Sequence, residues 1–119
     1  MRVTMSVKIY HNPRCSKSRQ TLQLLQEKGI EPEIIEYLKT PPTEEEVKDI
    51  LQKLGIEPRE LMRKKEAEYK ASGMDNPELD NEALIKGMTE TPKLIERPIV
   101  LANGKAAIGR PPEAVLEIL

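Results

Sequence analysis

A single cysteine stands where a short apolar run gives way to a helical pattern, and this junction constrains the fold more than any other stretch. The apolar run covers residues 7–10 and the helical pattern covers residues 16–28. Within that pattern Leu22 and Leu25 lie three residues apart and share one helix face. A strand that turns directly into a helix places the turn residues beside unpaired backbone N–H groups. We therefore expect Cys15 at a helix N-terminus.

The surroundings of Cys15 favour a reactive thiol. Arg14, Lys17 and Arg19 add positive charge within about one helical turn, and the helix dipole adds more. Both stabilise a thiolate, and both stabilise an oxyanion bound beside it. A buried structural cysteine is the alternative, since free cysteines are often buried. Polar and basic neighbours do not form an apolar slot, so the stretch predicts a cysteine of low pKa in a small anion-binding site.

The length and composition fit one domain in a reducing compartment. The chain has 119 residues and one cysteine, which cannot form an internal disulfide, and residues 1–6 lack the apolar centre of a signal peptide. We therefore expect a cytoplasmic protein. The net charge is −1 and no polybasic block occurs, which argues against nucleic-acid and membrane partners. Neither phenylalanine nor tryptophan is present, so we expect an aliphatic core.

The first third of the chain has the pattern of a β-α-β unit. Gly29 ends the first helix, Pro32 opens the next segment, and residues 33–38 follow as a second strand. This spacing predicts two parallel strands joined by a right-handed crossover. Residues 1–5 are expected to be a frayed start.

A helical insertion is predicted at about 43–91. Its clearest helix covers residues 43–54 and ends at Gly55. Thr43 and Glu46 have the spacing of a capping box at the start of this helix.

The rest of the insertion carries weaker signals. Residues 58–69 are predicted to be helical despite weak periodicity, and residues 72–77 form a loop. Asp80 can cap a further helix, which ends before Pro92.

A β-hairpin and a short helix complete the chain. Residues 99–102 and 105–109 are predicted as antiparallel strands, because Asn103-Gly104 between them is a strong two-residue hairpin signal. A last helix opens at Pro112 or Glu113. The order β-α-β, helical insertion, β-hairpin, α predicts an α/β, thioredoxin-like fold with a four-stranded mixed sheet. In such folds a reactive cysteine lies at the end of the first strand, where Cys15 stands.

Several motifs resemble one enzyme family. The blocks are HNPRCSKSR at 11–19 with TL at 21–22, YLKTPPT at 37–43, LMRK at 61–64, LIERPIV at 94–100 and GRPPE at 109–113. In this order they resemble the glutaredoxin-dependent arsenate reductases, and they run from near the start of the chain to near its end. The resemblance implies one thioredoxin-like domain over residues 1–119. Many relatives continue with a charged tail beyond the position of Leu119, and we expect no loss of chemistry because every motif position is present.

The resemblance also implies the residues of the site. Cys15 would be the catalytic nucleophile, and Arg63, Arg97 and Arg110 would bind arsenate. A guanidinium can hold two oxygens of such an anion, and its charge lowers the pKa of a nearby thiol. The thiolate would then attack arsenic, water would leave, and a Cys15–arsenate adduct would form.

The later steps need thiols from outside the chain. Ser18 occupies the position where a Cys-X-X-Cys motif would have its second cysteine. The resemblance implies glutathione as co-substrate, followed by glutaredoxin, which releases arsenite. No bound cofactor is expected. A metal site is not expected either, because one histidine and one cysteine do not make a four-ligand set.

Further residues could support the site. His11 could tune the thiolate or the anion, or only hydrogen-bond the loop backbone, and the two roles are equally open. Ser16 and Ser18 could cap the helix or donate to the anion, and capping is favoured. Asn12 is expected to shape the loop. The resemblance implies a cis peptide bond before Pro98, which would aim the preceding arginine at the site.

Two other functions remain open at this stage. The chain could be a glutathione-dependent thiol oxidoreductase of another specificity. It could also be a non-catalytic, redox-responsive regulator that binds RNA polymerase, as some relatives do. Those regulators carry Cys-X-X-Cys as a redox switch, which Cys15 and Ser18 do not provide.

Overall fold

The computed structural model describes residues 7–119, which form two compact units. The first unit contains residues 7–37 and 97–119, and the second contains residues 38–96. The expected frayed start at residues 1–5 lies outside the described residues. The single domain with an insertion at about 43–91 stays a prediction. Within residues 7–119 no helix combines the length and apolar character needed to cross a membrane.

The first unit is built on the predicted four-stranded mixed sheet. Its strands are β1 (Val7–His11), β2 (Glu33–Glu36), β3 (Ile99–Ala102) and β4 (Lys105–Ile108), in the order β2-β1-β3-β4. β1 is parallel to β2, and β3 is antiparallel to both β1 and β4. This arrangement confirms the thioredoxin-like fold. The second strand is shorter than expected, because Tyr37 and Leu38 already belong to a turn.

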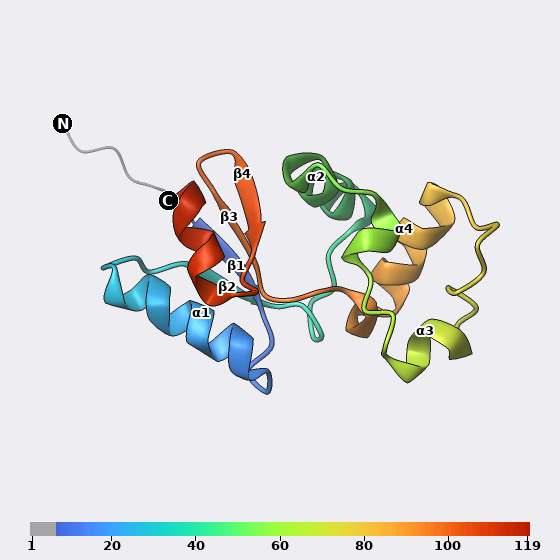
Figure 1. Ribbon diagram of the computed structural model, residues 1–119, viewed down its shortest axis with the longest axis horizontal. Helices are drawn as coiled ribbons and strands as arrows, with labels where there is room; N and C mark the ends of the chain where they lie inside the picture. The colour runs from blue at the N-terminus through green and yellow to red at the C-terminus, as the bar shows by residue number, and fades with distance from the viewer. Residues whose placement is uncertain (1–6) are drawn as a thin grey trace. The chain divides into compact units, whose positions relative to one another are not determined.

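One face of this sheet carries the core of the first unit. The helix α1 (Ser16–Glu27) and the 3-10 helix η3 (Pro112–Ile118) pack beside one another there (Figure 1). The core residues are Val7, Ile9, Leu25, Val100, Ala102, Val115 and Ile118. Leu25 is fully buried, and burying a leucine side chain stabilises a fold by about 1.5–3 kcal/mol. The closing helix is at its predicted place, but it is a 3-10 helix, a form that short segments often adopt.

The expectation of an aliphatic core is wrong in one respect. Tyr10 and Tyr37 are both almost completely buried. A tyrosine brings a large apolar ring, and this chain has no phenylalanine or tryptophan to supply one.

The second unit is helical and confirms most of the predicted elements. It contains α2 (Glu44–Leu54), η1 (Pro58–Leu61), α3 (Ala67–Ala71), α4 (Asn81–Glu90) and η2 (Pro92–Leu94). The capping box of Thr43 and Glu46 is present at the start of α2, and Gly55 ends that helix with a φ of 69°. Asp80 caps α4 by accepting a hydrogen bond from the N–H of Ala83 at 2.9 Å.

The prediction of a helix over residues 58–69 is wrong. Only a short 3-10 turn forms before Met62, whose backbone pairs with Ile95 in an isolated antiparallel bridge. α3 begins at Ala67. The tertiary pairing of two buried residues outweighs the weak helical periodicity of this stretch.

The hairpin register determines which residues meet beyond the strands. Asn103 and Gly104 have φ values of 54° and 72°, the positive values that a two-residue type I′ turn requires. This turn sets Ile99 opposite Ile108. The pairing continues past the strands, because the N–H of Gly109 donates to the carbonyl of Pro98 at 2.9 Å. The residues just beyond this pair, at positions 97 and 110, therefore emerge together.

Candidate active site

Cys15 is the N-cap residue of α1. Its backbone is extended, and its carbonyl accepts a hydrogen bond from the N–H of Arg19 at 3.0 Å. The preceding loop is shaped by Asn12, as predicted, since its carbonyl accepts from the Cys15 N–H and its Oδ1 accepts from the Arg14 N–H, each at 3.0 Å. No acidic residue lies in the first turn of α1. The positive end of the helix therefore acts on the sulfur without a competing carboxylate from that turn.

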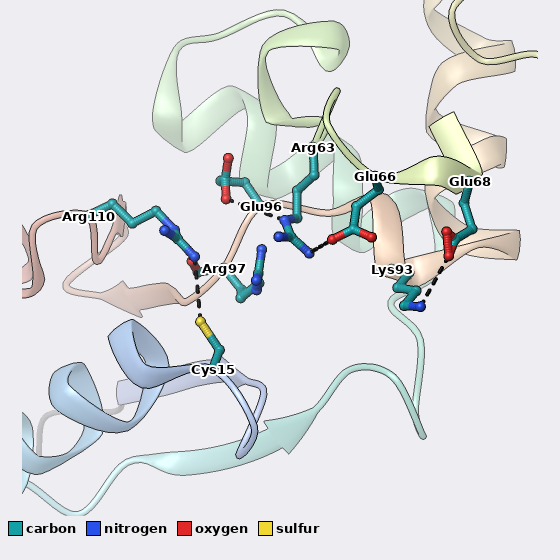
Figure 2. Close-up of polar contacts among 8 residues, drawn as sticks. All are labelled: Cys15, Arg63, Glu66, Glu68, Lys93, Glu96, Arg97 and Arg110. Carbon is teal, nitrogen blue, oxygen red and sulfur yellow. Dashed lines mark hydrogen bonds and ion pairs between the residues drawn. The ribbon is translucent and has the colours of Figure 1, made fainter. Parts of the chain in front are cut away.

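Arg110 lies against the sulfur. Its Nη2 donates to Cys15 Sγ at 3.5 Å, and its Nε donates to the backbone carbonyl of Arg97 at 2.7 Å. In Figure 2 the Cys15 sulfur points toward the Arg110 guanidinium, and a dashed line joins the two. The bond to the carbonyl orients a side chain that is otherwise exposed to solvent.

Arg97 enters the site from the start of β3. The residue is 9 % exposed, and the peptide bond to Pro98 is cis, as the family resemblance implies. Its charge acts on the Cys15 sulfur together with that of Arg110. Two of the three predicted anion-binding arginines are thus gathered around the cysteine by the hairpin.

Opposing influences set the pKa of Cys15. Burial is the largest and raises it. The backbone N–H of Ser18, the charge of Arg97, the backbone N–H of Lys17 and the charge of Arg110 all lower it. Together these four prevail, and the pKa of Cys15 lies below the ordinary value for a thiol. The predicted low pKa thus has its physical basis in the helix N-terminus and the two arginines.

The predicted capping role of the serines is wrong. No side chain of Ser16 or Ser18 caps α1, and Ser16 is exposed. Ser18 is fully buried, and its Oγ lies 2.6 Å from His11 Nδ1 and accepts from the Asn12 N–H at 3.0 Å. A buried hydroxyl needs partners, and the end of β1 supplies them. His11 therefore contacts a side-chain hydroxyl, not the loop backbone.

Arg63 belongs to the second unit and has acidic partners there. It forms an ion pair with Glu66, and its Nε lies 4.0 Å from Glu96 Oε1 (Figure 2). Its backbone is held as well, since its N–H donates to the carbonyl of Leu94 at 2.7 Å. Its predicted part in anion binding at Cys15 stays a prediction.

Two residues of the motif blocks, Thr21 and Gly109, have a structural role that was not predicted from the sequence. Thr21 is buried, and its Oγ1 donates to the Lys17 carbonyl at 2.8 Å and approaches the Gly109 carbonyl at 3.5 Å. A Cβ at Gly109 would lie 2.8 Å from Pro98 Cγ, so only glycine lets these segments approach. A glycine at a strand end, just before Arg110, is the signal that could have indicated this close contact.

Another basic residue has a purely local role. Arg59 donates to Tyr69 Oη at 2.6 Å and to the carbonyls of Met74 and Asn76, each at 2.8 Å. It fastens a loop of the second unit. Within the described part of the chain, no group of three or more His, Cys, Asp or Glu side chains could hold a metal ion.

Replacing Arg110 with alanine will raise the pKa of Cys15, because the change removes the guanidinium that contacts the sulfur. The rate of alkylation by iodoacetamide as a function of pH follows the thiolate and measures this pKa. Arg14→Ala is the matched control, since it removes the same charge from an exposed neighbour of Cys15. The structure places the charges of Arg97 and Arg110, and not that of Arg14, among the influences on Cys15, so this titration should match that of the wild type. The same match for Arg110→Ala would contradict the electrostatic account.

Protonation of His11 will lower the free energy of unfolding in mildly acidic solution. Burial lowers the pKa of His11, the carboxylate of Glu36 opposes this, and the charge of Arg19 reinforces it. The unfolded chain therefore binds the proton more readily than the native state. The free energy of unfolding should fall as the pH drops below about 6.5, which is the ordinary pKa of histidine.

Two measurements check this behaviour. His11 is the only histidine, so its imidazole resonance in an NMR titration is unambiguous. The titration should give a pKa below the ordinary pKa of histidine. The free energy of unfolding, measured with urea from pH 7.5 to 5.5, should depend less on pH in His11→Gln than in the wild type. A resonance that titrates at or above the ordinary value would overturn the explanation.

Known proteins match this chain over almost all of its length. The sequence profile of the ArsC family matches residues 10–118. The uncharacterized protein YfgD of Escherichia coli K12 is 58% identical over 118 residues, which cover 98% of this chain and 99% of that protein. An arsenate reductase of Neisseria meningitidis Z2491 is 56% identical over 114 residues, 95% of this chain and 97% of that protein. The solved structure of an arsenate reductase from Vibrio cholerae is 56% identical, with a TM-score of 0.95 over 98% of this chain and 100% of that one. With the motif blocks, the sheet and the Cys15 loop all in agreement with these matches, the chain belongs to the ArsC family.

Proposed function

We propose that this protein reduces arsenate to arsenite with Cys15 as the nucleophile. The observation that carries the proposal is the Arg110 guanidinium, which lies 3.5 Å from the Cys15 sulfur at the N-terminus of α1. A thiolate of lowered pKa and a binding place for an oxyanion thus come from the same charges. The arsenate reductases among the relatives support the choice of arsenate as the oxyanion.

The anion would be held by the two arginines of the first unit. Arg97 and Arg110 can each donate two parallel N–H groups to arsenate oxygens, and unpaired N–H groups of the first helical turn can donate to another oxygen. The acidic partners of Arg63 lie in its own unit, and Arg63 stays the third arginine that the family resemblance predicts. These charges would also offset the repulsion between the thiolate and the incoming anion.

The first step is a substitution at arsenic. The Cys15 sulfur forms a bond to arsenic, and one arsenic–oxygen bond breaks. The departing oxygen takes up protons and leaves as water. Arsenic remains pentavalent, so no electron has yet been transferred. The product is a covalent adduct of Cys15 with the arsenate group.

Two external thiols supply the two electrons. The sulfur of glutathione bonds to arsenic in the Cys15 adduct, and a second water leaves. A thiol of glutaredoxin then attacks the glutathione sulfur and forms a mixed disulfide, while the arsenic–glutathione bond breaks and its electron pair reduces arsenic to the trivalent state. Water finally cleaves the bond between Cys15 and arsenic and releases arsenite. The overall reaction converts arsenate and two thiols into arsenite, one mixed disulfide and one water.

This sequence of steps suits a chain with one cysteine. Cys15 cannot form an internal disulfide, so reduction must finish on other molecules. The glutathione pool of the cytoplasm would supply the second thiol, with no cofactor bound to the protein.

The test is arsenate-dependent oxidation of NADPH in the presence of glutathione, glutaredoxin and glutathione reductase. We expect turnover by the wild type and none by Cys15→Ser. Arg110→Ala should lower kcat/KM for arsenate by about 10- to 100-fold, because it removes a charged hydrogen-bond donor. Arg14→Ala again provides the matched control and should retain full activity.

Other outcomes would contradict the proposal. Turnover by Cys15→Ser would remove the cysteine from the mechanism. A folded wild type that ignores arsenate but reduces mixed disulfides with glutathione would indicate a thiol oxidoreductase of another specificity. Turnover without glutathione would overturn the assignment of the second thiol.

A further inference from the structure

A groove runs along α1 beside the candidate active site. Its volume is about 390 Å³, within the range of roughly 300–1,000 Å³ typical of small-molecule sites. One wall consists of Lys17, Gln20, Gln23, Leu24 and Glu27, and the other wall consists of residues 111–113. Both walls belong to the first unit.

The side chains that line the groove lie on a face of α1 different from the one that packs into the core. Residues 17, 20, 24 and 27 follow one another at steps of three and four, so they form a stripe along the helix. The core of the unit takes a different face, through Ser18, Thr21 and Leu25. Leu24 also packs against the core, so a ligand would meet the stripe mainly through the exposed side chains of Lys17, Gln20 and Glu27.

The groove ends near the reacting sulfur, since its lining includes close sequence neighbours of Cys15 and Arg110, although it contains neither of these two residues. Lys17 stands two residues after Cys15, and its backbone N–H favours the thiolate. On the opposite wall Pro111 directly follows Arg110, whose Nη2 lies 3.5 Å from that sulfur. A molecule in the groove would thus have one end within reach of an adduct on Cys15.

The charges of the groove are ordered along the helix. The ammonium of Lys17 marks the end next to Cys15, and the carboxylate of Glu27 lies ten residues later, about 15 Å along the axis. Between them Gln20 and Gln23 present amide groups, and Gln23 Nε2 donates to Glu27 Oε1 at 3.2 Å. Glu113 adds a second carboxylate from the other wall.

We propose that this groove is the binding site for glutathione. Three extended α-linked residues span about 10–11 Å, and the γ-linkage of glutathione adds to this length, so the tripeptide fits within the stripe of about 15 Å. Its glycine carboxylate would face Lys17, its amides would meet Gln20, and the ammonium of its γ-glutamyl group would face Glu27 and Glu113, with the carboxylate on the same carbon turned to solvent. The cysteine sulfur would then point toward the arsenic on Cys15 for the second step described above. This assignment rests on the proposed function, which names glutathione as the second thiol.

A direct binding measurement separates the groove from the reaction. S-methylglutathione keeps every charge and amide of glutathione but cannot react. Titrated into the ¹⁵N-labelled protein, it should shift the amide resonances of Lys17, Gln20, Leu24, Glu27 and Glu113 in a saturable way. Gln20→Ala should weaken this binding, while Gln26→Ala, which removes an exposed glutamine of α1 outside the groove, should leave it unchanged.

Steady-state kinetics provide a second test of the groove. In the arsenate assay Gln20→Ala should raise the KM for glutathione by about three- to tenfold, the effect of one lost hydrogen bond. The KM for arsenate should stay the same, because Gln20 is not part of the anion site. Gln26→Ala should change neither value. An increase in the KM for arsenate alone would overturn the assignment.

The two proposals fail in different ways. If arsenate turnover is present but S-methylglutathione shifts no groove resonance, the glutathione site is overturned and the reductase function stands. If the groove resonances shift and weaken in Gln20→Ala but arsenate is not reduced, the binding site is supported and the reductase function is overturned.

Discussion

The register of the β3–β4 hairpin decides whether two guanidinium groups meet at one sulfur atom. Asn103 and Gly104 set that register through their positive φ values. The pairing then runs along both strands to the bond between Gly109 and Pro98, and Arg97 and Arg110 emerge just beyond it. A slip by one residue would turn one arginine to the other face of the sheet. The electrostatics of the site thus depend on a turn at the far end of the hairpin.

The same charges have two effects that must be balanced. Arg97 and Arg110 lower the pKa of Cys15 and would also attract an oxyanion, whose own charge disfavours the neighbouring thiolate. A thiolate of very low pKa is a weaker nucleophile, so unlimited stabilisation would slow attack on arsenic. Burial of the thiol, the largest single influence, opposes the lowering. We infer that a partly buried sulfur beside an exposed arginine keeps the thiolate both populated and reactive.

The sequence predicts the parts of this account that depend on local rules. The change from strand to helix periodicity places Cys15 at the start of α1, and Thr43 with Glu46 marks the start of α2. Interactions between distant segments are beyond such rules. Local preference assigns Ser18 to capping, whereas its partner is a histidine seven residues earlier at the end of β1. The bridge from Met62 to Ile95 likewise breaks a stretch that resembles a helix when read alone.

The central claim is that Cys15 forms a bond to arsenic within a site built by Arg97 and Arg110. Arsenic K-edge X-ray absorption of the protein mixed with arsenate, with no other thiol present, observes this bond directly. A sulfur neighbour of arsenic is expected in the wild type, with little of it in Arg110→Ala and none in Cys15→Ser. An arsenic atom that keeps only oxygen neighbours in the folded wild type would contradict the claim.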